Sequence, residues 1–243
     1  MARRILVTAA LVLFGGFLVE FVAQQPGSGN VVVIDSFETD RIGDFPDRWF
    51  NRDGDTKPKD IEPEHRRRYH YKVKQENGNR YLSYEGHYAK HLNFRIGDDK
   101  SISLEKTPIL SWKWRAHELP RGATEADDSR NDAALSVYVV FGFRKILFQK
   151  VPKVIRYTWS SSLPEGTVVN KNFKQQKILV LESGTDKLGQ WQTVERNLAD
   201  DYRRFFGGEP PERPVAILVL SDANNTKSFA KGDYDDFLLK ADD

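Results

Sequence analysis

The chain has 243 residues, and 35 acidic side chains nearly balance its 37 basic ones, for a formal charge of +2. This balance argues against a nucleic-acid-binding protein with a dominating basic field. The absence of cysteine excludes disulfides, thiolate catalysis, cysteine zinc sites and lipoprotein acylation. Five histidines and one methionine argue against haem or copper chemistry, whereas 39% hydrophobic and 12% aromatic content predicts a folded core.

The N-terminal segment has the composition of an export signal. Two arginines precede Ile5–Val19, an uncharged apolar run that Glu20 ends. This run is shorter than the roughly 20 residues of a membrane-spanning helix, so a cleaved signal and an uncleaved anchor both stay open. Either places the body in the periplasm or another extracytoplasmic space, tethered to the inner membrane only if uncleaved. We expect a helical signal or anchor plus linker over residues 1–29, and a single domain over residues 30–243.

The body shows the period-two alternation of β-strands. Leu110, Trp112 and Trp114, for example, alternate with polar side chains, which places all three on one face of a strand. Turn-forming residues such as Asn77-Gly78-Asn79 separate the runs. Ten or more strands without alternating helices exclude a parallel βαβ sheet and predict an all-β sandwich. In chain order, the runs cover residues 31–34, 69–73, 92–96, 110–114, 135–141, 155–159, 178–181, 191–195, 215–220 and 234–240.

One short helix is predicted near the C-terminus. Asn197 is a typical N-cap residue, and the acidic residue three positions later resembles a capping box. Apolar side chains then recur at helical spacing up to Phe206. Gly207-Gly208 marks the end of the helix, and Pro210-Pro211 prevents its resumption. We expect this helix to pack across one sheet or to close one end of the sandwich.

A series of motifs runs in one order along nearly the whole body: Phe45-Pro46-Asp47-Arg48-Trp49, Leu110-Ser111-Trp112-Lys113-Trp114, Asn131-Asp132-Ala133-Ala134, Tyr157-Thr158-Trp159-Ser160, Gly189-Gln190-Trp191, Glu195-Arg196-Asn197, Phe206-Gly207-Gly208-Glu209-Pro210-Pro211, Asp222-Ala223-Asn224-Asn225-Thr226 and Tyr234-Asp235-Asp236-Phe237. Through these motifs, residues 36–238 resemble a bacterial family catalogued as domain of unknown function 3047. The chain departs from that pattern at Asn131, where a second acidic residue is more usual. The layout is also similar to galactose-binding-like jelly rolls. The resemblance implies a jelly-roll-like antiparallel β-sandwich and export, without an established activity.

Carbohydrate binding suits such a sandwich, because sugars stack on aromatic rings and their hydroxyls bond to polar side chains. Four of the five tryptophans fall on strand faces and are expected in the core, whereas Trp49 follows a turn and is expected to be partly exposed. Arg156 alternates with Ile155 and Tyr157, so it is expected on the opposite face of its strand. The predicted partner is a glycan or polysaccharide, and the candidate ligand-binding residues are Trp49, Asp132, Arg156, Arg196 and Asn225.

A structural calcium ion is a second hypothesis. Asp35 and Glu38 end the first predicted strand, and Asp235 and Asp236 begin the last one. In galactose-binding-like folds the terminal strands lie side by side, which would bring these carboxylates together, and Ca²⁺ takes six to eight oxygen ligands. The candidate metal ligands are Asp35, Glu38 and Asp236. The alternative is that the aspartate pair caps a turn and that no cofactor is bound.

Catalysis is the third hypothesis. A glycan hydrolase needs two carboxylates about 5–9.5 Å apart, and a lyase needs a base such as His117 or Tyr138 beside a cation such as Arg156. The sequence contains no G-x-S-x-G nucleophile motif, no H-E-x-x-H zinc motif, no P-loop and no G-x-G-x-x-G motif. The candidate carboxylates are Asp128, Asp132, Glu195 and Asp222.

The charged residues around the predicted helix also have a structural interpretation. Arg196 is placed to pair with Asp200 or Asp222 and so to join the helix to a sheet. The favoured prediction is an exported envelope protein that binds a glycan without catalysis. The alternatives are a glycan hydrolase or lyase, and an envelope assembly protein whose aromatic face meets another protein.

Overall fold

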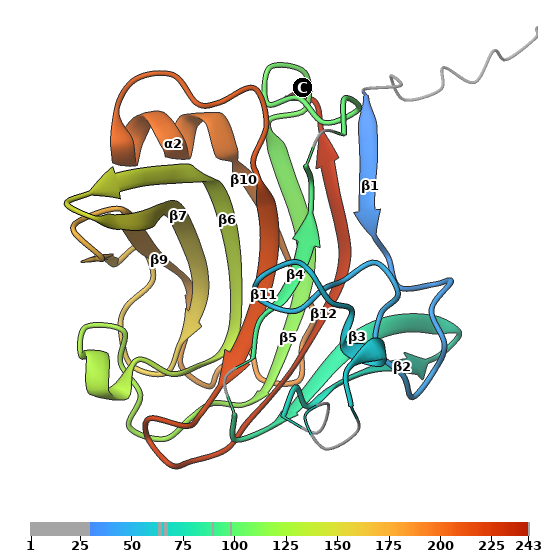
Figure 1. Cartoon of the computed structure of the whole chain (residues 1–243). Helices are drawn as coiled ribbons and strands as arrows, with labels where there is room; N and C mark the ends of the chain where they lie inside the picture. The colour runs from blue at the N-terminus through green and yellow to red at the C-terminus, as the bar shows by residue number, and fades with distance from the viewer. Residues whose placement is uncertain (1–29, 63–64, 66–67, 89, 98, 243) are drawn as a thin grey trace, which may run out of the picture.

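The computed structural model describes residues 30–242 except 63–64, 66–67, 89 and 98. Two six-stranded sheets pack face to face (Figure 1). Sheet A has the order β10-β5-β12-β3-β2, with β1 also pairing with β12. It contains β1 (Val31–Asp35), β2 (Tyr71–Glu76), β3 (Asn79–Gly86), β5 (Ile109–Glu118), β10 (Gln192–Asn197) and β12 (Ala230–Lys240). Sheet B has the order β4-β11-β6-β7-β9-β8. It contains β4 (Leu92–Arg95), β6 (Ala133–Ile146), β7 (Gln149–Ser160), β8 (Val168–Lys171), β9 (Gln176–Ser183) and β11 (Ala216–Asp222).

The predicted all-β sandwich is confirmed. All strand pairs in the described part of the chain are antiparallel except β7 with β9, which are parallel. Strand β8 pairs antiparallel with β9 at the edge of sheet B. Two short 3-10 turns, η1 (Pro58–Asp60) and η2 (Asp128–Arg130), lie in the connections. The predicted export segment lies outside the described residues. Within the described part of the chain, no helix has the length and hydropathy to cross a membrane.

The core fills the space between the sheets. Trp112 and Trp114 of β5 are edge-on to each other at 5.4 Å, and Trp112 contacts Tyr157 of β7 at 5.6 Å between ring centroids. Gly232 of β12 lets the sheets approach closely, since a Cβ atom there would lie 2.6 Å from Leu135 of β6. Aromatic and β-branched side chains therefore hold this cysteine-free fold by packing alone.

Two tyrosine hydroxyls of sheet A complete the hydrogen bonding of sheet B. The ladder between β11 and β6 shifts register between Leu220 and Asp222. The hydroxyl of Tyr234 accepts from Ser136 N at 2.9 Å and donates to the Leu220 carbonyl at 3.1 Å. The hydroxyl of Tyr71 accepts from Ser221 N at 2.9 Å. These bonds give hydrogen-bond partners to buried backbone groups of sheet B beside the register shift.

The predicted helix is confirmed as α2 (Leu198–Phe206), which lies across one end of the sandwich (Figure 1). The Asn197 side chain accepts from Asp200 N at 3.0 Å, and Gly207 takes a φ of +72° where the helix ends. Tyr202 covers the end of the core by contacting Phe141 at 5.1 Å between ring centroids. The capping pattern and the apolar stripe are local signals, so the sequence was sufficient to predict this element.

Tyr234→Phe is expected to lower the free energy of unfolding by about 1–3 kcal/mol, because it leaves Ser136 N–H and the Leu220 carbonyl buried without their shared partner. Urea unfolding followed by circular dichroism measures this difference. Tyr88→Phe, at a side chain that is 55% exposed, is the matched control and should change stability little. Equal stability of the two variants would contradict the role given to the Tyr234 hydroxyl.

Candidate functional site

An open groove of about 750 Å³ runs over the outer face of sheet B. Its floor is apolar, because alternate residues of β6, β7 and β11 point away from the core and gather in a second buried cluster. Among the floor residues, Tyr138 and Leu218 are each only 8% exposed although they lie on the outer face. The other floor residues are Val140, Val154 and Ala216. A face that keeps such side chains largely from water is concave and provides the shape of a ligand site.

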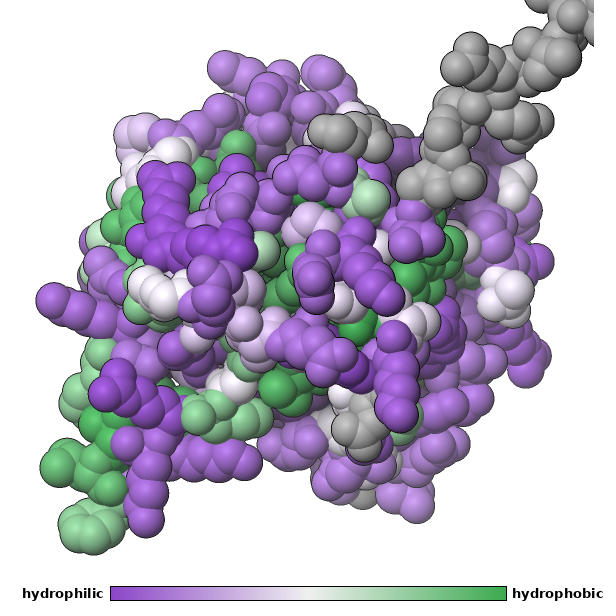
Figure 2. All heavy atoms as spheres, turned by 90° about the horizontal axis from the view of Figure 1, so that it is seen from above, coloured by the Kyte–Doolittle hydropathy of each residue, from purple (hydrophilic) through white to green (hydrophobic). Residues whose placement is uncertain are grey.

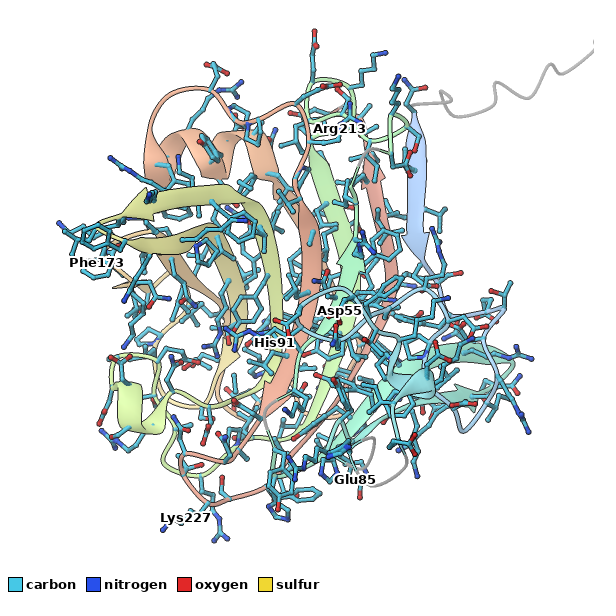
Figure 3. The ribbon with its side chains drawn as sticks, in the orientation of Figure 1. Asp55, Glu85, His91, Phe173, Arg213 and Lys227 are labelled. Carbon is cyan, nitrogen blue, oxygen red and sulfur yellow. The ribbon has the colours of Figure 1, made fainter. Side chains whose placement is uncertain are left out.

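One wall of the groove is the loop 51–56, which is fixed by its own hydrogen bonds. Asn51 Oδ1 accepts from Gly54 N at 3.0 Å and from Asp55 N at 3.1 Å. Asn93 Nδ2 on β4 donates to the Arg52 carbonyl at 3.1 Å and so ties the loop to the sheet. Gly54 has a φ of +76°, and a Cβ atom there would lie 3.2 Å from Asn93 Nδ2. Figure 3 shows this loop, with Asp55 labelled, over the middle strands near His91.

The groove lining contains exposed cations and one buried hydrogen-bond acceptor that has no partner in the described part of the chain. Arg52, Arg95 and Lys150 are exposed along it, and Asp53 is the one acidic residue among its described lining. Asn93 Oδ1 is buried in the groove wall without a hydrogen-bond partner among the described residues. An acceptor in that state costs free energy until a donor from a ligand or water reaches it. The lining is therefore suited to a hydroxyl-rich or anionic ligand.

His91 and Tyr138 join the wall to the floor. Their rings meet edge-on at 5.2 Å, and the Arg156 guanidinium lies 5.6 Å from the Tyr138 ring centroid. Desolvation, with the nearby Arg52 and Arg156 cations, lowers the pKa of His91 to about 3. His91 is therefore neutral at physiological pH and can both donate and accept a hydrogen bond.

Arg156 lies beside the floor, on the opposite face of β7 from Ile155 and Tyr157, which are in the core. It is only 2% exposed, and its donors are used within the fold. Nη1 donates to Asn131 Oδ1 at 2.7 Å, and Nε donates to Ser136 Oγ at 3.0 Å. Arg156 therefore packs beside the floor, against Tyr138, and is not part of the groove lining.

Asp132 and Asn225, two further predicted ligand residues, lie together. Asp132 is fully buried, and its carboxylate accepts from Asn225 N at 3.2 Å and from Thr226 N at 2.7 Å. Asn225 Nδ2 donates to the Asp128 carbonyl at 3.0 Å. Because these bonds shape the turn after β11, the carboxylate of Asp132 is not free to bind a sugar hydroxyl in this conformation.

The expected exposure of Trp49 is wrong. Its side chain is fully buried, stacks 6.1 Å from Phe37 and donates from Nε1 to Asp35 Oδ2 at 2.8 Å, so it cannot stack on a sugar here. The expectation that Trp191 lies in the core is also wrong. Trp191 is half-buried outside the core, where the Arg115 guanidinium lies 4.5 Å from its ring centroid. Position relative to a turn therefore did not predict exposure.

Arg196 belongs to a network that joins α2 to both sheets. Its guanidinium pairs with Asp201 rather than with Asp200 or Asp222, and Nε donates to Asp201 Oδ2 at 2.9 Å. The Tyr157 hydroxyl of β7 donates to the same oxygen at 2.8 Å. The structural interpretation of Arg196 therefore matches its contacts, since Arg196 is outside the groove lining.

The proposed calcium site is not formed. Strands β1 and β12 do lie side by side as expected, but the carboxylates have separate partners. Asp35 binds Trp49, Glu38 accepts from Arg80 N at 2.9 Å, and Asp236 pairs with Lys113 at 2.8 Å. In the described part of the chain, no three His, Asp or Glu side chains come together as a metal site.

The candidate catalytic carboxylates do not meet in the groove. Glu195 pairs with Lys240 at 2.8 Å on sheet A, and Asp128 pairs with Lys171 at the end of β8. His117 is also on sheet A, where Nε2 bonds to Asp233 at 2.6 Å. Asp132 and Asp222 adjoin, yet neither lines the groove.

Asp222 nevertheless has unusual chemistry. Burial raises its pKa to about 7, with a further contribution from the neighbouring Asp132 and opposition from the Arg156 cation. Asp222 is 7% exposed and accepts from Ala133 N at 3.3 Å. It is therefore a partly protonated acid near neutral pH within the buried polar layer beside the groove floor.

Most groove residues were not predicted from the sequence. Arg52, Asp53, Arg95 and Lys150 come from three separate segments and resemble ordinary surface charges. The one available signal was the apolar character of both faces of β6, where Tyr138 and Val140 alternate with core residues. Strands that are apolar on both faces indicate that the outer face is covered or concave.

The fold and the groove define a β-sandwich protein with an open groove on the outer face of one sheet. The chain belongs to the family described as protein of unknown function (DUF3047), whose model matches residues 48–238, which confirms the resemblance noted in the sequence. The search of curated proteins found no match.

Solved structures with a similar chain course include three carbohydrate-binding modules. The family 30 module of cellulosomal cellulase Cel9D-Cel44B of Clostridium thermocellum has a TM-score of 0.42 and 12% identity, over 88% of this chain and 98% of that one. The family 11 module of Lic26A-Cel5E of the same organism has a TM-score of 0.35 and 11% identity, over 71% of this chain and 81% of that one. A module specific for non-crystalline cellulose, CBM28, has a TM-score of 0.35 and 15% identity, over 71% of this chain and 82% of that one.

Asp222→Asn is expected to change how stability depends on pH. The folded state holds a proton that the unfolded chain has released between pH 3.8 and about 7. The free energy of unfolding therefore falls as pH rises through this window, by at most about 1.4 kcal/mol for each pH unit, and this loss is complete above it. Urea unfolding of both proteins from pH 4.5 to 8 measures the difference. A difference that does not vary with pH would contradict the assignment.

Proposed function

We propose that this protein binds a polysaccharide chain along the groove of sheet B, and that it prefers polysaccharides carrying carboxylate groups. The observation that carries the proposal is the lining itself, in which an apolar floor lies beside three exposed cations and a buried acceptor that no described residue satisfies. Apolar floors accept the hydrogen-bearing faces of sugar rings, and surrounding polar groups bind their hydroxyls.

The form of the groove supports a chain rather than a small molecule. Its volume of about 750 Å³ lies within the range of ligand sites, but it is open over the surface between the loop 51–56 and the β6–β7 hairpin. Arg52 and Lys150 of the lining lie on these two elements. An open groove of this kind admits a segment of a longer polymer.

The charges of the groove support an anionic polymer. Arg52, Arg95 and Lys150 outnumber the single Asp53 along the described lining, and His91 is neutral. Arginine binds carboxylates through two parallel hydrogen bonds, which gives direction as well as attraction. This excess of cations distinguishes the groove from the rest of a nearly neutral chain.

The alternative of a glycan hydrolase has less support. Asp222 has the raised pKa of a general acid, and Asp132 adjoins it. Both carboxylates are buried, and Asp132 is fixed to the turn after β11 by two backbone N–H groups. A hydrolase would need both carboxylates at the scissile bond, and neither lines the groove.

Export is part of the proposal and is supported by the sequence alone. The uncharged run Ile5–Val19 follows two arginines, and the described body contains no cysteine to require a reducing compartment. A polysaccharide-binding protein outside the cytoplasm would meet its ligand in the cell envelope or beyond it.

Arg95→Ala is expected to weaken binding to polygalacturonate about tenfold, or about 1.4 kcal/mol. Affinity electrophoresis of the full chain in gels containing polygalacturonate, or neutral mixed-linkage β-glucan for comparison, measures this change. Arg41→Ala is the matched control, because Arg41 is exposed and lies outside the groove lining. Equal retardation of both variants, or no retardation by any polysaccharide, would overturn the proposal.

Leu11→Arg combined with Leu13→Arg is expected to hold the protein in the cytoplasm, because two charges interrupt the apolar run. Fractionation of a bacterial host followed by immunoblotting measures the distribution. The control is Thr8→Ser, which should leave the protein in the envelope or periplasmic fraction. Cytoplasmic wild-type protein would contradict export.

A further inference from the structure

Two neighbouring turns at one end of sheet B carry an exposed apolar group, which we call the hairpin tip. Leu147 is 80% exposed and Phe148 is 96% exposed at the β6–β7 turn, and Phe143 nearby on β6 is 51% exposed. Phe173, between β8 and β9, is 64% exposed. Figure 3 shows Phe173 at the extreme left beside the end of this hairpin, and Figure 2 shows hydrophobic side chains projecting at the corresponding corner.

The same tip is strongly cationic. Residues 133–164 and 166–181 contain no Asp or Glu, so the two segments that build the tip carry positive charge alone. Arg144, Lys145, Lys150 and Lys174 are exposed and form no ion pair with another described residue. Glu209, which shares an adjoining surface hollow with Phe143 and Arg144, pairs with Arg203 at 2.8 Å.

The composition of the tip works against folding stability. Leu147 has a φ of +54° in a two-residue hairpin turn, a position that favours Asn or Gly. Lys145 and Lys150 are direct cross-strand partners, and like charges at such positions repel. Phe173 also has a positive φ, of 55°. Side chains that cost stability and lie exposed indicate a role outside the folded core.

We propose that the hairpin tip docks on a lipid bilayer that carries anionic headgroups, with Leu147, Phe148 and Phe173 entering the interface. Apolar side chains on a narrow projection can enter the headgroup region, while the surrounding lysines and arginine remain at the charged surface. A stable protein interface buries roughly 800 Å² on each partner, and two narrow turns offer a small contact area by comparison. The charge complementarity therefore favours a membrane over a protein partner.

This inference is independent of glycan binding, although the two sites adjoin. Phe143 and Lys150 belong to the tip and also line the groove. Docking of the tip would hold this part of the groove near the membrane surface. Arg95→Ala, which should weaken polysaccharide binding, should leave docking unchanged.

The absence of cysteine allows the tip to be labelled at one position in the full chain. Gln149→Cys, carrying an environment-sensitive fluorophore, should show a blue shift and at least a twofold rise in emission with vesicles of equal parts phosphatidylglycerol and phosphatidylcholine. The change should be much smaller with phosphatidylcholine alone and should be lost in 0.5 M NaCl. A label at Lys227→Cys, which Figure 3 shows at the lower end of the molecule, should not respond.

Variants then test which side chains enter the bilayer. Phe148→Ser with Phe173→Ser, in the Gln149→Cys protein, should reduce the vesicle response at least tenfold, and Lys145→Glu with Lys174→Glu should do the same. Ile42→Ser is the matched control, because Ile42 is 48% exposed and lies on another loop. Thermal unfolding of each variant shows that the fold persists.

Three outcomes would overturn the proposal. The first is a tip label that does not respond to anionic vesicles, even if the full chain binds them through another segment. The second is an unchanged vesicle response in the double serine variant. The third is an oligomer, seen by light scattering, that dissociates in the double serine variant while the vesicle response stays the same, which would identify the tip as a protein interface.

Discussion

The contact on which the arrangement of this protein depends is made by two tyrosine hydroxyls that cross from sheet A into sheet B. Tyr234 bridges Ser136 N–H and the Leu220 carbonyl, and Tyr71 accepts from Ser221 N–H, where the β11–β6 ladder shifts register. Without these bonds, backbone groups would be buried unpaired between the sheets. Gly232 makes the bridge possible, because it brings β12 close to Leu135 of β6.

Fixing this junction also fixes the outer face of sheet B. Beyond the junction, β6 and β11 present Tyr138, Val140 and Leu218 as an apolar floor, while Arg156 and Asp222 form a buried polar layer beside it. The polar layer meets the floor where Arg156 packs against the Tyr138 ring, and neither Arg156 nor Asp222 lines the groove. Ligand contacts are therefore left to exposed side chains on the loop 51–56, β4 and the β6–β7 hairpin.

The long β6–β7 hairpin has two roles in the proposed function. Near the sheet it supplies part of the groove lining, and at its turn it carries the exposed apolar and cationic side chains of the hairpin tip. A protein that uses both would hold a polysaccharide beside a membrane surface. Each role has its own residues, because Arg95 lies only in the groove and Phe148 only at the tip.

The all-β class, most of the strands, the family and the helix α2 could be predicted from the sequence, because alternation, capping and motif order are local properties. The strands β3 and β8 and the order of the strands within each sheet were not predicted. The exposure of individual side chains, and which of them come together in the groove, depended on the tertiary structure. Trp49 is buried because its turn folds back on Phe37 and Asp35, and the groove combines residues from distant strands. A period of two assigns a side chain to a face, but the pairing and curvature of the sheets determine whether that face meets the core, a loop or water.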